Sequence, residues 1–302
     1  MYGLNTQQVN LSNRVERAEV EAFLQGFDLL LDRDVDYTLV IRDGAQYPAA
    51  QGAPIVATCS KAKSVLKCFA VAEEFRGQGI TAILISALID KLFSQGIYHS
   101  FIFTKPAQAH VFEALNFKLI HSNAEVALLE NGIHNIHKAL EQMKANYSLG
   151  DAEKAALVLN CYPFTLRHYD LIEEAAKNHQ EVLVFIVEED QSLLPFETRY
   201  DLICQGVAHL DNVKVVPSGE YIISFTTFPS YFIKEEEKRR RAHAELEASM
   251  FGKYFCKHFN IRKRYVGEEP DCSEAADYND ALQTVLPQYG VEVTRIPRVS
   301  SE

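Results

Sequence analysis

The stretch from Leu157 to Leu171, LVLNCYPFTLRHYDL, constrains the fold of this 302-residue chain more than any other. Its apolar start, Leu157 to Leu159, predicts a short buried strand, and the residues from Leu171 onward have the spacing of an amphipathic helix. A strand that ends in a Thr/His turn and continues into a helix places the helix N-terminus where a phosphate can bind. His168 follows Thr165 by three residues, so the two side chains can face the same anion.

Length and composition indicate an ordinary globular protein with two domains. A chain of 302 residues is about twice as long as a typical single domain. Hydrophobic residues make up 47% of it and charged residues 24%, as in most globular proteins. The net charge of −11 argues against a nucleic-acid binder, which would usually have a basic surface, but it allows a local basic pocket for a nucleotide.

The cysteines and the N-terminal segment predict a cytoplasmic protein. None of the 6 cysteines belongs to a C-x-x-C pair, so we expect reduced, mostly buried thiols and no zinc site. The first residues have no apolar signal core, and no run approaches the roughly 18 consecutive apolar residues of a membrane helix. We therefore expect neither a membrane nor a nucleic acid as a partner.

The N-terminal half alternates strands and helices around a glycine-rich loop, Arg76 to Gly79. The expected elements are strands at 36–42, 55–59 and 64–71, a helix at 80–92, a strand at 98–104, a helix at 107–115, and strands at 116–121 and 125–130. This order, together with the loop and the segment Phe112 to Phe117, resembles the GNAT acyltransferase family. The resemblance implies that Arg76, Gly77 and Gly79 hold the pyrophosphate of a coenzyme-A-like arm at a helix N-terminus.

The C-terminal half predicts a parallel sheet of Rossmann type, because strands and helices alternate at short spacing. The expected elements are strands at 157–160, 182–187 and 213–216 and helices at 168–178 and 196–206. A connecting helix at 134–147 leads to Ser148-Leu149-Gly150-Asp151, which we take as the boundary between a domain of residues 1–148 and a domain of residues 149–302. The charged run 233–247 predicts a solvated helix.

Several segments of the C-terminal half resemble the citrate lyase ligase family. They are Asn160 to His168, Phe185 to Arg199, Ser218 to Tyr231 (SGEYIISFTTFPSY), and Tyr265 to Pro270 with Tyr278-Asn279. The first also resembles the T/H-x-G-H signature of nucleotidyltransferases, and the third is the most specific, since no general rule of folding demands it. The resemblance covers nearly the whole chain. It implies an α/β protein with an N-terminal GNAT-like mixed α+β domain followed by a Rossmann-like parallel-sheet nucleotidyltransferase domain.

The resemblance implies an ATP-dependent acid–thiol ligase. Such an enzyme would adenylate acetate with ATP and Mg²⁺, and would then acetylate a thiol on the acyl carrier subunit of citrate lyase. The thiol belongs to a phosphoribosyl-dephospho-coenzyme A group, and AMP and pyrophosphate leave. Positioning and charge stabilisation would supply most of the catalysis.

The resemblance also implies residue roles. His168 would donate to the α-phosphate as charge builds there, and Thr165 would bond the same phosphates or cap the helix. Further nucleotide-binding candidates are Asn160, Phe164, Arg167, Arg199, Gly267 and Glu269. Asn160 could instead complete a turn, and Arg199 could pair with Glu197. The two acids at 189–190 could bind Mg²⁺ with ATP or form an exposed strand end, so no side chain is assigned as a metal ligand.

The chain departs from the family pattern at three places. Arg167 stands where the motif has Gly, and Tyr162 stands where the family tends to have Asn. The family closes with an I-S-x-S-x-x-R segment, and we expect this phosphate-binding segment to be absent from Ile296 to Glu302. Two other functions therefore stay open. One is a GNAT-type acyltransferase that uses acyl-coenzyme A, and the other is a catalytically impaired module that binds the carrier protein.

Overall fold

The chain folds into two compact units. The computed structural model describes residues 5–43, 52–188, 194–225, 228–268 and 273–297. The first unit comprises Met1–Asn135 and Pro229–Arg239, and the second comprises Ile136–Phe228 and Arg240–Glu302. The sequence placed the boundary at residue 148, after the connecting helix. The units instead divide before that helix, and an eleven-residue segment (229–239) of the C-terminal half belongs to the first unit.

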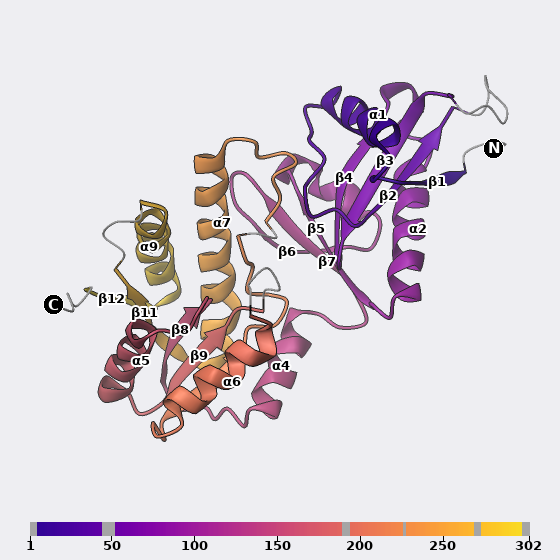
Figure 1. The fold of residues 1–302 in the computed structure, drawn as a ribbon. Coiled ribbons are helices and arrows are strands. Elements are labelled where there is room, and N and C mark those ends of the chain that lie inside the picture. The colour runs from indigo at the N-terminus through magenta and orange to yellow at the C-terminus, as the bar shows by residue number, and fades with distance from the viewer. Residues whose placement is uncertain (1–4, 44–51, 189–193, 226–227, 269–272, 298–302) are drawn as a thin grey trace. The chain divides into compact units, whose positions relative to one another are not determined.

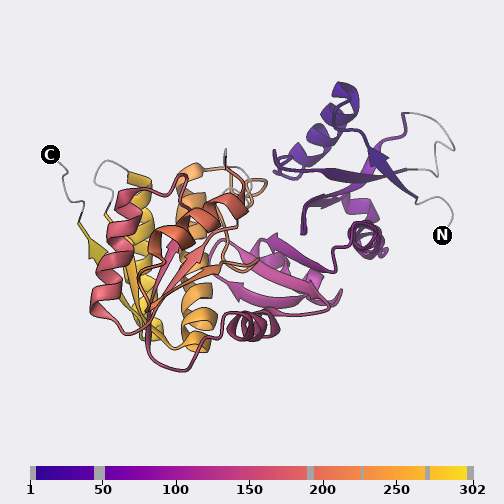
Figure 2. The same cartoon turned by 60° about the horizontal axis from the view of Figure 1, so that its bottom comes forward.

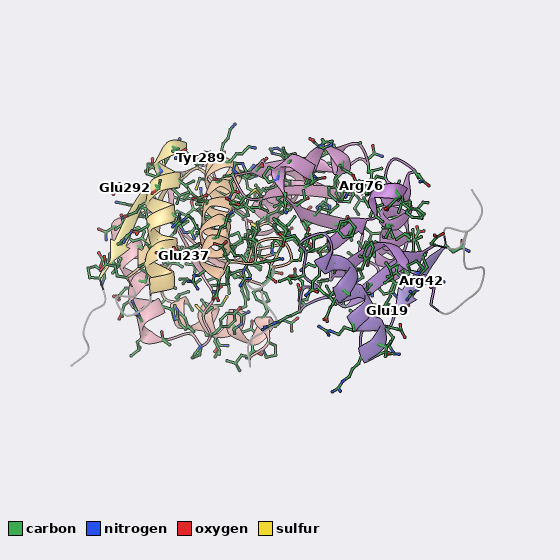
Figure 3. The ribbon with its side chains drawn as sticks, turned by 90° about the horizontal axis from the view of Figure 1, so that it is seen from above. Glu19, Arg42, Arg76, Glu237, Tyr289 and Glu292 are labelled. Atoms are coloured by element: carbon green, nitrogen blue, oxygen red, sulfur yellow. The ribbon has the colours of Figure 1, made fainter. Side chains whose placement is uncertain are left out.

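The first unit is built on a mixed sheet with the strand order β1-β2-β3-β4-β5-β7-β6 (Figure 1). The strands are β1 (Thr6–Val9), β2 (Tyr37–Arg42), β3 (Ile55–Ala62), β4 (Val65–Val71), β5 (His99–Thr104), β6 (Lys118–Ser122) and β7 (Ala127–Gly132). The helices are α1 (Arg14–Gln25), α2 (Ile80–Ser94) and α3 (Ala109–Glu113). The predicted elements of this half are thus confirmed, with ends that shift by a few residues. An ion pair of 2.6 Å between Arg42 of β2 and Glu19 of α1 joins the sheet to a helix (Figure 3).

Strands β4 and β5 are parallel and pair at only two positions, at the start of β4 and in the middle of β5. The pairs are Val65 with Phe101 and Leu66 with Ile102. Beyond them the register between β3 and β4 shifts, so that Cys68 and Phe69 oppose one residue of β3, and Cys68 has a φ of 56°. Such a bulge bends a strand away from its neighbour. The bulge therefore accounts for the parting of β4 from β5.

The second unit is built on a wholly parallel sheet with the order β10-β9-β8-β11-β12. The strands are β8 (Lys154–Leu159), β9 (Val182–Ile186), β10 (Val213–Pro217), β11 (Ile261–Gly267) and β12 (Glu292–Ile296). The helices are α4 (Ile136–Asn146), α5 (Leu166–Asn178), α6 (Phe196–Val207), α7 (Glu236–Met250), α8 (Lys257–Phe259) and α9 (Ser273–Val285), with a π-helical segment (Phe251–Cys256) between α7 and α8. The predicted parallel α/β sheet is confirmed.

Helices cover both faces of this sheet. Apolar residues of α5 and α6 share a buried cluster with β8 and β9, and Figure 2 shows these two helices beside the sheet. On the other face, the ring of Phe185 in β9 contacts Phe251, Phe255 and Phe259, with centroids 5.6 to 6.0 Å apart. The layered arrangement is that of a doubly wound α/β fold.

The charged run at 233–247 corrects one prediction. It does form most of α7, but the helix is buried from Ala242 to Ala244 and again from Leu246 onward, so it is not a solvated helix along its length. Glu247 is only 3% exposed there. Its carboxylate accepts a hydrogen bond of 2.8 Å from the hydroxyl of Tyr278 and lies 3.5 Å from Arg264 of β11. Buried charges of this kind are tolerated only with such partners.

Within the described part of the chain, no helix is both long and apolar enough to cross a bilayer.

Candidate functional site

The candidate nucleotide site lies where the parallel sheet reverses its order. From β8 the chain moves to β9 and β10 on one side, while β11 and β12 lie on the other side of β8. The connections after β8 and β11 therefore lead in opposite directions, and open α/β sheets bind ligands at the carboxyl ends of the strands at such a point. Helix α5 begins there, with Thr165 as its N-cap residue.

Thr165 and His168 are brought together, as the sequence predicted, in a capping box. The backbone N–H of Thr165 donates to Nδ1 of His168 at 3.1 Å, and the Thr165 hydroxyl lies 2.8 Å from the same nitrogen. A nitrogen that accepts from a backbone N–H carries no proton of its own. The neutral ring therefore carries its proton on Nε2, which makes Nε2 a hydrogen-bond donor at the start of the helix.

Arg167 connects the start of α5 with the end of β11. Its guanidinium, on α5, donates to the backbone oxygen of Glu268, directly after β11. Gly267 is its neighbour: a Cβ added there would lie 3.9 Å from the Arg167 Nη2 atom. The structure thus brings together two predicted site residues, Arg167 and Gly267, that are far apart in sequence. The third candidate of this turn, Glu269, lies outside the described residues.

Arg199 lies beneath the site in a buried position, 1% exposed. Its guanidinium donates to the backbone oxygen of Asn160, after β8, at 2.5 Å and to that of Val187, after β9, at 3.3 Å. Its Cζ atom also lies 4.4 Å from the ring centroid of Tyr162. The described contacts therefore make Arg199 a connection between two strand ends. Asn160 itself has its side chain at an exposed position.

Phe164 and Cys161 position the turn by packing. The ring of Phe164 packs on α6 so closely that a Cβ at Gly206 would lie 2.6 Å from it, and the ring is stacked at 6.2 Å from that of His168. Cys161 is buried, and burial raises the pKa of its thiol to about 12. The thiol is therefore protonated at neutral pH and is no nucleophile.

The structure adds one contact at this edge that the sequence reasoning missed. Ser218, 0% exposed after β10, accepts from the backbone N–H of Glu188 after β9 at 3.1 Å. The Glu188 carboxylate accepts in turn from the backbone N–H of Gly219 at 3.0 Å. The signal was available, since the Ser-Gly pair opens the SGEYIISFTTFPSY run directly after a predicted strand. The acids at 189–190 lie outside the described residues.

The predicted glycine-rich loop lies in the first unit, before α2. Gly77 and Gly79 have φ values of 75° and 77°, in the left-handed region that favours glycine, and Gly79 is the N-cap residue of α2. Arg76 is exposed, and its Nε donates to the backbone oxygen of Val71 at 3.3 Å (Figure 3). A Cβ added at either glycine would meet no atom within 4 Å, so the loop has open space above it.

A cavity of about 660 Å³ adjoins this loop. The loop residues Arg76, Gly77 and Gly79 line it together with apolar residues of β4, α3 and the segment 229–239. Cavities of this size and mostly apolar lining are typical of sites for small molecules and cofactors. Among the described residues, no group of three or more His, Cys, Asp or Glu side chains is placed to hold a metal ion.

Comparisons with known proteins agree with this architecture. Residues 154–302 match the family model "Citrate lyase ligase C-terminal domain", and residues 28–117 match "Acetyltransferase (GNAT) family". The predicted fold class, a GNAT-like mixed domain followed by a parallel-sheet domain, is thereby confirmed.

Individual relatives extend over nearly the whole chain. The citrate (pro-3S)-lyase ligase of Escherichia coli (strain K12) is 32% identical over 296 residues, which cover 98% of this chain and 82% of that protein. The corresponding ligase of Klebsiella pneumoniae is 29% identical over 294 residues, which cover 96% of this chain and 83% of that protein. A phosphopantetheine adenylyltransferase of Corynebacterium efficiens is 38% identical over 68 residues, 22% of this chain and 43% of that protein. The chain therefore belongs to the citrate lyase ligase family and is an enzyme of the ligase class.

Proposed function

We propose that this ligase activates acetate with ATP and transfers the acetyl group to a thiol of the citrate lyase acyl carrier subunit. In the first step a carboxylate oxygen of acetate attacks the α-phosphorus of ATP. The bond from that phosphorus to the bridging oxygen breaks, and pyrophosphate leaves. In the second step the thiolate of the phosphoribosyl-dephospho-coenzyme A group attacks the acetyl carbon, and the carbon–oxygen bond to AMP breaks.

One observation carries the proposal: the two bonds between Thr165 and Nδ1 of His168 direct the remaining ring proton to Nε2. A donor fixed in this way at a helix N-terminus suits a phosphate, because the N-terminal N–H groups and the helix dipole favour negative charge there. In the attack on the α-phosphorus, negative charge grows on the phosphate oxygens. His168 would stabilise that charge without having to reorient.

Arg167, the neighbour of His168 at the start of α5, supports the same proposal. In the resting structure it donates to a neutral carbonyl oxygen, that of Glu268. A phosphate oxygen is a stronger acceptor for a guanidinium, because the hydrogen bond is then assisted by charge on both partners. When ATP binds, Arg167 would exchange this carbonyl for a phosphate. Mg²⁺ would enter with ATP and be held largely by the phosphate oxygens, as is usual for this ion.

The first unit would receive the thiol arm. Its glycine-rich loop offers N–H groups at the start of α2 for the diphosphate, with Arg76 beside them, and the adjoining cavity of about 660 Å³ would hold the pantetheine portion. ATP and reduced thiols are both available in the cytoplasm, where we expect the enzyme to act.

Pyrophosphate release tests the proposal. The full chain would be incubated with ATP and Mg²⁺, once with acetate and once without it. The variants His168→Ala and Arg167→Gly would be treated in the same way. We expect release that depends on acetate and is strongly reduced by His168→Ala.

The alternatives have different outcomes in the same assay. Acetyl transfer from acetyl-coenzyme A in the absence of ATP would identify an acyltransferase of the GNAT type instead. No release by any variant, together with no heat of ATP binding in calorimetry, would leave a module that binds the carrier protein.

A further inference from the structure

One part of the SGEYIISFTTFPSY run serves the first unit. Its last residues, Pro229, Ser230 and Tyr231, begin the segment Pro229–Arg239, which clusters with the N-terminal residues and which we call the strap. The ligase reaction proposed above for the second unit gives these residues no role. Their contacts must therefore be explained within the first unit.

A buried ionic network anchors the strap. Ser230 donates its backbone N–H to the carboxylate of Asp32 at 3.2 Å, and its hydroxyl donates to the same oxygen. The other oxygen of Asp32 lies 3.0 Å from Nζ of Lys67 on β4, which also binds Asp34 at 2.8 Å. Asp32 and Lys67 have side chains only 3% and 2% exposed. Burial acts to lower the pKa of Lys67, but the two carboxylates outweigh it and raise the pKa, so the lysine stays charged.

Tyr231 stands between the parted ends of β4 and β5. Its hydroxyl donates to the backbone oxygen of Phe103 on β5 at 2.5 Å, and its ring packs in a cluster with Cys68 and Ala70 of β4. The side chain is 5% exposed. A ring held by a hydrogen bond on one strand and by packing on the other has little freedom to move. Burial also raises the pKa of the Tyr231 phenol well above its ordinary value, so the hydroxyl remains a donor.

The same ring forms part of the wall of the cavity of about 660 Å³ beside the glycine-rich loop, which we call the front cavity. The cavity is lined by Tyr231 and Phe232 of the strap and by Gly77 and Gly79 of the loop. The Tyr231 ring clusters with Cys68 and Ala70 of β4, and Cys68 lies at the bulge where the strands begin to part, whereas the loop follows the end of the strand at Val71. An arm whose diphosphate sits on the loop and which runs inward along β4 would thus approach the Tyr231 ring with its sulfur end.

We infer that Tyr231 makes the front cavity selective for an arm that ends in a free thiol over the same arm carrying an acyl group. An acetyl group adds atoms beyond the sulfur, at the end that the fixed ring closes. The inference rests on the part of the proposed function that places a coenzyme-A-type arm in this cavity. It gives the enzyme a means of holding its thiol substrate more tightly than its thioester product, so that the product is released after transfer.

Calorimetry with two commercial probes tests the inference on the full chain. Coenzyme A, kept reduced, and acetyl-coenzyme A would each be titrated into the wild-type protein, Tyr231→Ala and Tyr231→Phe. We expect the wild type to bind coenzyme A about tenfold or more tightly than acetyl-coenzyme A, since a rigid pocket discriminates a few extra atoms by about that factor. Tyr231→Ala should bind the two probes about equally. Tyr231→Phe keeps the ring and should keep most of the preference.

Each possible result of these titrations either supports or overturns the inference. Equal binding of both probes by the wild type, binding of neither, or an unchanged preference in a folded Tyr231→Ala protein would overturn the inference. If Tyr231→Ala does not fold, as judged by circular dichroism, the wild-type comparison and Tyr231→Phe still decide. The titrations contain no ATP or acetate, so they are independent of the pyrophosphate assay described above. A protein that prefers coenzyme A in the titrations but releases no pyrophosphate in that assay would refute the proposed ligase reaction and leave the inference standing.

Discussion

Arg167 donates a hydrogen bond to the backbone oxygen of Glu268, which lies about a hundred residues further along the chain. The bond connects the start of α5 with the end of β11, the two elements that flank the reversal of strand order. Glycine in the family motif allows a phosphate to approach the backbone closely. In this chain an arginine stands at that position, and its side chain reaches the backbone directly after β11.

Arg167→Ala should weaken ATP binding about tenfold, because it removes a charge-assisted hydrogen bond worth about 1.5–3 kcal/mol. Arg167→Lys, which keeps the charge but loses the second donor of the fork, should weaken binding less. The dissociation constants would be measured by calorimetry with ATP and Mg²⁺. Unchanged or tighter binding by Arg167→Ala would show that the arginine only obstructs the site.

His168→Ala should lower kcat for acetate-dependent pyrophosphate release by about 10²–10³, as is typical when a donor to developing charge is removed. Thr165→Ala should have a smaller effect, because the backbone N–H at position 165 still donates to Nδ1 and keeps the proton on Nε2. Steady-state kinetics on both variants provide the comparison. Equal losses in the two variants would contradict this account, because they would show that the backbone N–H alone does not hold the ring in its working orientation.

Arg199→Leu should destabilise the protein by about 2–4 kcal/mol, since a buried cation is lost that bonds two strand-end carbonyls. Arg295→Ala is the matched control. Arg295 pairs with Asp280, which is 70% exposed, and such surface pairs contribute about 0–1 kcal/mol. Urea unfolding of both variants would measure the difference. A cost for Arg199→Leu no larger than that of the control would contradict the proposed connection between β8 and β9.

Stability should fall as the pH drops below about 6.5, and His179 should contribute to this fall. Burial lowers the pKa of His179, whose Nε2 lies 3.0 Å from the hydroxyl of Tyr265. In the unfolded chain a histidine titrates near pH 6.5, so between that pH and the lower folded pKa the unfolded state binds more protons. Thermal unfolding at pH 7.5 and pH 5 should therefore show a smaller pH effect in His179→Gln. The same pH effect in both proteins would exclude this histidine as a cause.

The sequence predicted the elements that have strong apolar periodicity. Strands β8, β9 and β10 and helices α5 and α6 were found because most of their buried residues are apolar, and the Thr165–His168 contact followed from helical spacing alone. Strand β11 was missed. Its residues Arg262, Lys263 and Arg264 are charged, so the segment lacks the apolar pattern of a buried strand. Arg264 is nevertheless buried, because a carboxylate on α7 and a tyrosine hydroxyl on α9 interact with its guanidinium. Such pairing between distant segments leaves no local signal.

The roles of Arg199 and Arg167 were also beyond the sequence. Both arginines were predicted to bind the nucleotide, and that prediction still awaits experiment. Their contacts with backbone oxygens depend on how three separate strands end at one edge of a sheet. Backbone acceptors are the same at every position, so no residue pattern can reveal them. Tyr231 is a similar case, since its neighbours on β4 and β5 are more than a hundred residues away in sequence.

The strap has a practical consequence for anyone who wishes to study the halves of this enzyme separately. A fragment that stops before residue 229 would lack Ser230 and Tyr231, and would leave Asp32 without two of its donors. Neither a cut at residue 135 nor one at residue 148 yields a complete N-terminal module. An N-terminal fragment that keeps these contacts would need residues 229–239 joined to it through a linker. A fragment without them should be insoluble or fold poorly.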